Sequence, residues 1–416
     1  MSFLSEIFQY EWVWRALFAS VMVGVMCGIL GCFIVLRNMA LIGDALSHAI
    51  LPGVVFAFMI AGYSTIAFFV GSVVAGLIAA VSITWIQHHS GTKNDAAVGI
   101  IFTSMFAVGV MGISWISRTQ GVHLDLKDFL FGNVLGVSDD DLLMAASVLI
   151  YVLLSIIVFY RYLFITTFQP IIAQAMGFSV KTLHYFLMLL LSVAVVASLQ
   201  TVGVILVVAM LITPASTALL LTNRLNRVLL LSALIGGLAA IVGFFGALWI
   251  ETVPGPAMTV AATLFYFVAL LFAPQKGLVT SFWRKRKLLQ KIRLEDVLKQ
   301  TLKLHERGIL NRKNLEEKLG FSPEQLSRYL QLLRSQSQLT SSGELTQQGE
   351  QTAQSLVRAH RLWETYLAQQ VGLDETQIHN DAERYEHLLT IELLEEVDRT
   401  LGFPTSDPHG SPIPMK

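Results

Sequence analysis

The stretch VWRALFASVMVGVMCGILGCFIVL, residues 13–36, has one charged side chain among its apolar residues. A membrane-spanning helix needs about 20 mostly apolar residues, so this stretch predicts a span. Similar runs follow near 46–61, 65–87, 96–116, 142–160, 183–199, 201–221, 228–250 and 257–273. The sequence therefore predicts an all-α polytopic membrane protein with eight or nine transmembrane helices, because polar breaks at 37–48 and near Gln200 leave the number open.

Charge divides the chain into two parts. Residues 1–283 hold ten Lys or Arg and ten Asp or Glu, and residues 284–416 hold nineteen of each. We expect four segments: a transmembrane domain at 1–276, a basic juxtamembrane linker at 277–291, a winged helix-turn-helix at 292–346 and a helical metal-binding and dimerisation domain at 347–416. Cys27 and Cys32 lie within an apolar run, which favours packing over a disulfide. No removable signal peptide is expected in Met1–Trp14.

The distribution of basic residues predicts the orientation of the spans. Arg284, Lys285, Arg286 and Lys287 follow the last apolar run, so the C-terminal part is expected in the cytoplasm. The loop 251–256, which has no Lys or Arg, is expected on the opposite side. The acidic loop 117–141 is expected there too; its carboxylates are Asp125, Asp128, Asp139, Asp140 and Asp141.

The pattern of the soluble part predicts helices at 292–305, 312–319 and 322–335, with Ser322 as N-cap and Pro323 in the first turn. A short hairpin at 339–346 follows, and this order is that of a winged helix-turn-helix. Longer helices are expected at 347–370 and 380–401, with a non-helical tail from Asp407. Two roles stay open for the winged helix: DNA binding, or protein interaction and dimerisation. The candidate DNA contacts are Gln325, Arg328 and Arg334.

Asp44 and His48 form the first constellation with chemical meaning. Their i, i+4 spacing places a carboxylate and an imidazole on one face of a helix. Both lie within apolar sequence, where ionisable groups are costly and often functional. The pair can be a ligand set for Mn²⁺, Fe²⁺ or Zn²⁺, or a hydrogen-bonded pair that only fixes helix packing.

The segment from Leu36 to Gly53, LRNMALIGDALSHAILPG, resembles the signature of the metal-permease family of ABC transporters. Residues 95–102, 129–138 and 211–217 resemble the same family in the same order, so the resemblance covers about 12–275. It implies that Asp44 and His48 belong to the metal pathway, and that a short cytoplasmic helix docks on the ATPase. The residues that match this coupling helix are Phe168, Gln169, Pro170, Ala175 and Gly177. No G-x-x-x-x-G-K-[ST] occurs in the sequence, so a separate subunit is expected to supply ATP hydrolysis.

The C-terminal part holds a second cluster of carboxylates and imidazoles. Glu383, Glu386 and His387 are spaced to share one helix face, with His379 one turn earlier, and His360 and Glu364 are spaced i, i+4. Such a set is either a metal site or a solvated charged face.

Residues 292–414 resemble the metal-dependent repressors of the diphtheria toxin repressor and manganese regulator type. The resemblance implies a ligand set for the sensed metal: Asp296, His360, Glu364, His379, Glu383, Glu386 and His387. Lys299 stands where the manganese regulators place a further carboxylate, which would weaken or remove one metal position. The absence of the Cys and Met ligands found in the iron-type members favours manganese over iron.

Together these features predict the membrane subunit of an ABC importer for a divalent transition metal, manganese first and then iron or zinc. It would be a transport subunit and not an enzyme, in a bacterial cytoplasmic membrane, and would bind no nucleotide. The expected partners are an ABC ATPase, a second permease subunit (identical or related) and an extracytoplasmic metal-binding protein. The fused domain is expected to sense metal, and DNA is a further candidate partner. The alternative is a membrane-tethered metal-dependent regulator whose spans act mainly as an anchor or sensor.

Overall fold

The computed structural model describes residues 10–414 except 63, 121–133, 341, 372–377, 379–381, 384, 386 and 388. The chain divides into two compact units, Met1–Ser281 and Phe282–Lys416. The first holds the apolar runs, and the second holds most of the charge. Of the expected extracytoplasmic carboxylates, Asp125 and Asp128 lie outside the described residues.

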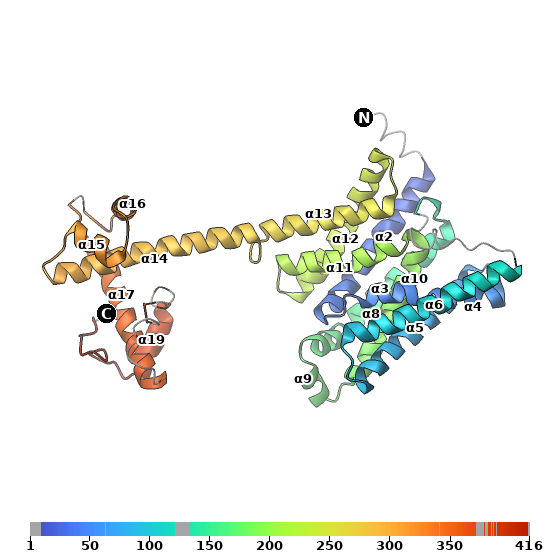
Figure 1. Ribbon diagram of the computed structural model, residues 1–416, viewed down its shortest axis with the longest axis horizontal. Helices are drawn as coiled ribbons and strands as arrows, with labels where there is room; N and C mark the ends of the chain where they lie inside the picture. Colours follow the sequence, from blue (N-terminus) through green and yellow to red (C-terminus); the bar gives the residue numbers. More distant parts are fainter. Residues whose placement is uncertain are drawn as a thin grey trace. The chain divides into compact units, whose positions relative to one another are not determined.

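The membrane unit is a bundle of helices (Figure 1). Among the described residues, nine spans are long and apolar enough to cross a membrane, which confirms the all-α polytopic prediction and its higher count. One span, Ile42–Ala61, consists of α3 (Ile42–Ala49) and α4 (Leu51–Ala61). The other eight are α2 (Glu11–Leu36), α5 (Thr65–His89), α6 (Asn94–Gln120), α8 (Asp139–Phe168), α10 (Val180–Val202), α11 (Val204–Leu221), α12 (Leu225–Ile250) and α13 (Pro254–Phe272).

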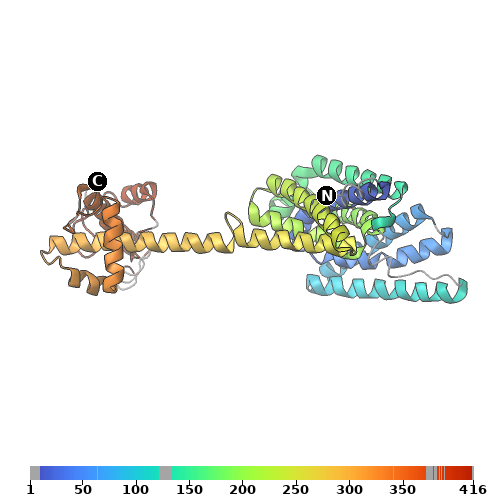
Figure 2. The same ribbon diagram turned by 90° about the horizontal axis from the view of Figure 1, so that it is seen from above.

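Helices α2 and α10 form the centre of this unit. The most apolar window of each is 72% buried, whereas that of α6 is 17% buried. Figures 1 and 2 both show α6 along an outer edge of the bundle. Small residues allow the central helices to approach closely: Gly24 of α2 lies against the backbone of Gly236 of α12, and Gly31 lies against the carbonyl oxygen of Leu211 of α11. Close contact of this kind is typical of helices that pack in lipid.

Two breaks interrupt the apolar sequence. Helix α3 ends at Ala49 and α4 begins at Leu51, with Pro52 in its first turn, so the polar segment that contains Asp44 belongs to the span. Helices α10 and α11 are separated by Gly203, whose φ of 80° is readily adopted by glycine alone. The break expected near Gln200 therefore lies three residues further along the chain.

The second unit contains α15 (Arg312–Leu319), α16 (Pro323–Ser335), α17 (Gln347–Tyr366) and α19 (Ile391–Thr400), together with most of α14 (Leu278–Glu306). Leu298, Leu326 and Leu333 lie in its apolar core. Ser322 and Gln325 form a capping box at the start of α16. An antiparallel bridge pairs Leu339 with Leu345. The element order agrees with the winged helix-turn-helix, which stays a prediction.

Helix α14 runs through the segment 277–291 from Leu278 onward, and the basic linker expected there stays a prediction. One helix prediction in this unit is wrong, because a single helix over 380–401 is not formed. Thr390 caps a new helix, α19, since its hydroxyl accepts a hydrogen bond of 3.3 Å from the amide of Leu393. His387 therefore lies in a turn, while the tail from Asp407 is non-helical as expected.

Candidate metal sites

Helix α3 presents Asp44 and His48 side by side. Nε2 of His48 lies 3.7 Å from Oδ1 of Asp44, and their side chains are 18% and 48% exposed. This separation is longer than a hydrogen bond, which ends at about 3.2 Å. It is close to the ~3–3.6 Å that separates two ligands bound at about 2.0–2.2 Å to one ion. The pair therefore stays a candidate ligand set for a cation, beside the alternative of a pair that fixes helix packing.

The rings of α6 hold the imidazole of His48 in place. Phe102 and Phe106 lie with their ring centroids 5.3 Å and 5.4 Å from that of His48, the latter edge-on. Nδ1 of His48 is buried and has no hydrogen-bond partner among the described residues. The aromatic walls thus keep Nε2 directed at Asp44 without a competing polar contact.

The segment that carries this pair rests on α11. A Cβ atom placed on Gly43 would lie 2.7 Å from Cδ1 of Leu211, the residue whose carbonyl oxygen also contacts Gly31. Leu211 begins the segment 211–217, one of the four that resemble the metal-permease family, and Pro214 lies in the same helix. Two motifs that are far apart in the sequence therefore pack together behind the candidate metal pair.

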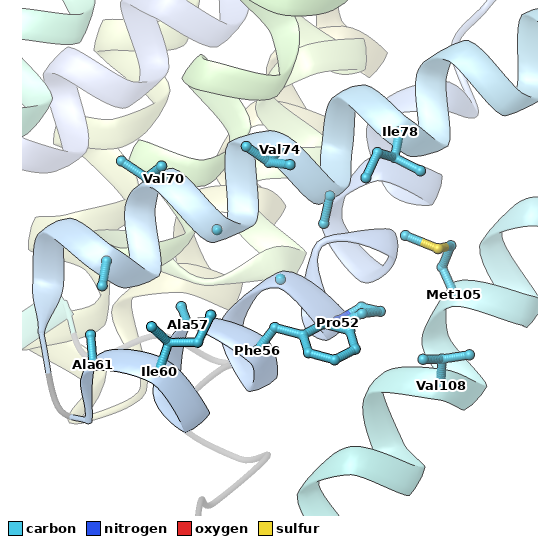
Figure 3. A pocket seen from close by; sticks show the side chains of 14 residues that line it. Pro52, Phe56, Ala57, Ile60, Ala61, Val70, Val74, Ile78, Met105 and Val108 are labelled. Atoms are coloured by element: carbon cyan, nitrogen blue, oxygen red, sulfur yellow. The ribbon is translucent and has the colours of Figure 1, made fainter.

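A large cavity near these helices does not offer metal ligands. It has a volume of about 510 Å³ and lies among α4, α5 and α6. Figure 3 shows side chains such as Phe56, Val74 and Val108 around it. None of the lining side chains carries oxygen or nitrogen, the donors that Mn²⁺, Fe²⁺ and Zn²⁺ take from carboxylates and imidazoles. This cavity is therefore not a candidate metal site, and the pair on α3 stays one.

The predicted coupling segment folds as a short exposed helix, α9 (Pro170–Ala175). Ile171 is 81% and Met176 59% exposed, whereas Ala173 is buried. Gly177 follows with a φ of 85°. These exposed apolar side chains are available for contact with a partner protein or with the membrane.

The sequence analysis did not predict the role of Arg37, whose side chain connects the end of α8 with the segment between α2 and α3. Arg37 donates a hydrogen bond of 3.0 Å to the hydroxyl of Thr166 and another of 3.1 Å to that of Thr167. Both threonines lie at the end of α8, directly before α9, and Arg37 directly follows α2, five residues before α3 begins. The available signal was a guanidinium at the end of an apolar run, where a long cation usually finds a partner.

In the second unit, α17 holds His360 and Glu364 as a buried pair. Nε2 of His360 lies 3.1 Å from Oε1 of Glu364, with the two side chains 5% and 3% exposed. A solvated face would leave both side chains in water, so this part of the predicted cluster is not a solvated charged face. Burial of a carboxylate requires a positive or hydrogen-bonding partner, which the imidazole supplies.

His387 lies between two carboxylates of α14. Its Nδ1 is 2.8 Å from Oε2 of Glu295, and its Nε2 is 3.1 Å from Oδ1 of Asp296. The predicted ligands Asp296 and His387 are therefore brought together, although 91 residues separate them in the chain. Glu295 was not foreseen; its place next to Asp296 on the same helix was the only signal. Lys299 of this helix is 2% exposed, so a cation is buried on the same element.

The remaining predicted ligands are not all placed. Glu383 is exposed, while His379 and Glu386 lie outside the described residues. Within the part of the chain that the structure describes, no group of three or more His, Cys, Asp or Glu side chains is arranged to hold a metal ion. The described ligands form two separate sets, His360 with Glu364 and His387 with Asp296.

The candidate DNA contacts lie on α16 in different surroundings. The side-chain oxygen of Gln325 accepts from the amide of Ser322, so this residue is a helix cap. Arg334 is exposed. Arg328 lines a cavity together with cations of α14.

The described residues hold nine spans that are long and apolar enough to cross a membrane, which defines a multi-pass membrane protein. Residues 9–273 match the family described as the ABC 3 transport family, and this chain belongs to that family. The match covers all nine spans, which supports a permease over a regulator whose spans are only an anchor. Residues 346–415 match the metal binding and dimerisation domain of iron dependent repressors.

Several characterised proteins are similar over the membrane part. The manganese transport system membrane protein MntC of Halalkalibacterium halodurans is 46% identical, over 68% of this chain and 95% of its own length. The protein of the same name from Listeria monocytogenes is 43% identical, over 70% of this chain and all of its own length. Among solved structures, PsaBC from Streptococcus pneumoniae in complex with Fab is 39% identical with a TM-score of 0.59, covering 66% of this chain and 96% of that one.

Proposed function

We propose that this chain is the membrane subunit of an ABC importer that carries Mn²⁺, with Fe²⁺ and Zn²⁺ as the other candidates. The observation that carries the proposal is the Asp44–His48 pair, which lies within a span with its carboxylate and imidazole 3.7 Å apart. Oxygen and imidazole nitrogen are the ligand types that suit manganese, iron and zinc. The relatives named above are manganese transport proteins, which favours manganese among these.

The same proposal assigns partners to the exposed parts of the membrane unit. A separate ATPase subunit docks on α9, whose apolar side chains Ile171 and Met176 are exposed. A second permease subunit completes the pathway, and an extracytoplasmic binding protein delivers the metal. The basic residues after α13 favour a cytoplasmic location for the second unit. With nine spans, α2 then begins on the extracytoplasmic side.

For the second unit we propose that cytoplasmic Mn²⁺ binds at Asp296 and His387 and lowers the rate of uptake. The buried pair His360 and Glu364 offers a further ligand set. Because the second unit is tethered to the permease by the same chain, the effective concentration of this unit near the permease is high. The competing role is DNA-dependent repression through α16.

The pathway assignment is tested by uptake of radioactive Mn²⁺ in cells that express the complete transporter. We expect Asp44→Asn and His48→Ala each to lower uptake by at least about tenfold, the loss typical of a disturbed metal site. Glu251→Gln and His89→Ala are matched controls in exposed positions of the same unit and should leave uptake unchanged. Uptake at the wild-type rate in both pathway variants would refute the assignment.

The sensing role has a separate test. A chain that ends at Lys276 is compared with the full chain in cells preloaded with Mn²⁺, with surface expression measured for both. We expect preloading to lower Mn²⁺ uptake in cells with the full chain. In cells with the shortened chain, uptake should continue at the rate seen without preloading. The same reduction in both would show that the second unit does not control transport.

A further inference from the structure

The second unit contains a strongly basic cavity that the metal chemistry does not use. It has a volume of about 570 Å³ and lies between α14 and α16. Four cationic side chains line it, and no carboxylate does. The cations are Arg286, Lys287 and Arg293 of α14 and Arg328 of α16.

One face of α14 forms most of the cavity wall. Trp283, Arg286, Lys287 and Arg293 are spaced at three, four and ten residues, which places them along one side of a helix. The exposed rings of this segment, Phe282 and Trp283, are 58% and 59% exposed. The guanidinium of Arg286 lies 5.4 Å from the ring centroid of Phe282. The face thus combines cations with exposed aromatic surface.

The opposite wall is fixed by the core of the unit. Tyr329 is 9% exposed, and its ring centroid lies 5.4 Å from that of Phe321. Its hydroxyl accepts a hydrogen bond of 3.0 Å from Nη1 of Arg293. Arg293 is therefore held toward the cavity by a buried residue of α16, and the adjacent Arg328 adds a second guanidinium. Guanidinium groups in fixed positions are the side chains best suited to binding phosphate oxygens.

We propose that this cavity binds the phosphate headgroup of an anionic phospholipid. The lipid is favoured over other phosphate sources because Trp283 comes only eleven residues after Phe272, where the last span ends. A connection of this length limits the distance between Trp283 and the end of the span, because an extended chain covers at most about 3.5 Å per residue. Exposed Trp283 and Leu289 suit the lipid interface, where aromatic and apolar side chains next to cations are typical.

The proposal has a consequence for the second unit. Arg328, a candidate DNA contact, is occupied while the headgroup is bound. Lipid and DNA would therefore compete for α16, and the domain would bind DNA only when no headgroup occupies the cavity. Arg334 lies on a different side of α16 and does not line the cavity, so it separates the two interactions.

The test uses the full-length chain in nanodiscs of phosphatidylcholine alone, or of about three parts phosphatidylcholine to one part phosphatidylglycerol. Hydrogen exchange of the α16 amides is measured in both. We expect exchange to slow several-fold with phosphatidylglycerol, and this slowing to be lost in Arg286→Gln and Arg328→Gln. Lys285→Gln on the opposite face of α14, and Arg334→Gln on α16, remove the same charge outside the cavity and should keep it. Unchanged exchange in α17 confirms that each variant is folded.

Three results would overturn the proposal. Equal slowing in all four variants would show diffuse attraction to the membrane in place of a headgroup site. The same slowing caused by inorganic phosphate in phosphatidylcholine nanodiscs would identify a free anion as the ligand. Slowing by duplex DNA but not by phosphatidylglycerol, with loss in Arg334→Gln, would identify a DNA-binding face. None of these readouts involves metal, so they are independent of the transport proposal.

Discussion

Replacing Gly31 with alanine tests whether the close approach of α2 and α11 sets the stability of the membrane unit. A Cβ atom on Gly31 would overlap the carbonyl oxygen of Leu211. This oxygen belongs to the helix backbone and cannot rotate away as a flexible side chain can. The two helices must therefore move apart, which weakens the contacts on both sides of the crossing.

The size of the effect follows from two opposing contributions. Alanine gains about 1 kcal/mol over glycine in a helix. Overpacking of a well-packed site costs about 1–3 kcal/mol, and a backbone clash belongs at the upper end of that range. The expected net destabilisation of Gly31→Ala is about 2 kcal/mol, which lowers Tm by roughly 4–8 °C. In Gly237→Ala the new Cβ would lie 3.5 Å from Cγ2 of Val25, an ordinary contact, so Tm should stay equal or rise.

The assay is thermal unfolding of the purified chain in detergent, followed by loss of the monodisperse peak in size-exclusion chromatography. Both variants carry the same chemical change in a membrane helix, so the difference between them isolates the clash. A Tm for Gly31→Ala equal to or above that of Gly237→Ala would refute the reasoning. In that case the bundle would tolerate a wider separation of α2 and α11.

Three further outcomes follow from the side chains that the sequence did not reveal or that depart from the repressor pattern. Arg37→Gln should lower Mn²⁺ uptake while the complete transporter still hydrolyses ATP, because the link between α3 and the end of α8 is lost; a parallel fall of both rates would contradict this. Glu295→Gln should weaken Mn²⁺ binding by about 10–100-fold in calorimetry, since Glu295 orients His387. The exposed Glu306→Gln on the same helix is its control, and equal affinities would contradict the orienting role. Lys299→Glu should allow one more Mn²⁺ per chain to bind, as counted by metal analysis after gel filtration; an unchanged count would show that the lysine does not block a site.

The parts of the molecule that obey local rules were predictable. Asp44 and His48 are four residues apart on a helix, so their proximity follows from helical geometry alone. The spans were predictable from length and composition, because the thickness of the bilayer sets the number of apolar residues that a spanning helix needs. Ser322 and Pro323 mark the start of α16 because a hydroxyl cap and a first-turn proline act within one turn.

The parts that depend on contacts between distant segments were not predictable. The bonds from Arg37 to Thr166 and Thr167 span 129 and 130 residues, and nothing in the local sequence selects those partners. The polar residue Gln200 indicated a break between α10 and α11, but its exact position at Gly203 depends on a positive φ that the polarity of the sequence does not reveal. Thr390 was read as a helix-interior residue, since a threonine within a periodic pattern can be either interior or cap.

The buried lysine of α14 predicts that the second unit binds a single ion. Lys299 is 2% exposed and lies one turn after Glu295 and Asp296, both of which contact His387. The resemblance aligns Lys299 with a carboxylate of the manganese regulators. An ammonium in place of a carboxylate makes the local charge more positive by two elementary charges. At short range and away from water, such a charge opposes a second divalent cation more strongly than in solution. We therefore expect the domain to bind one Mn²⁺ without cooperativity, so that uptake declines gradually as cytoplasmic metal rises instead of switching at a threshold.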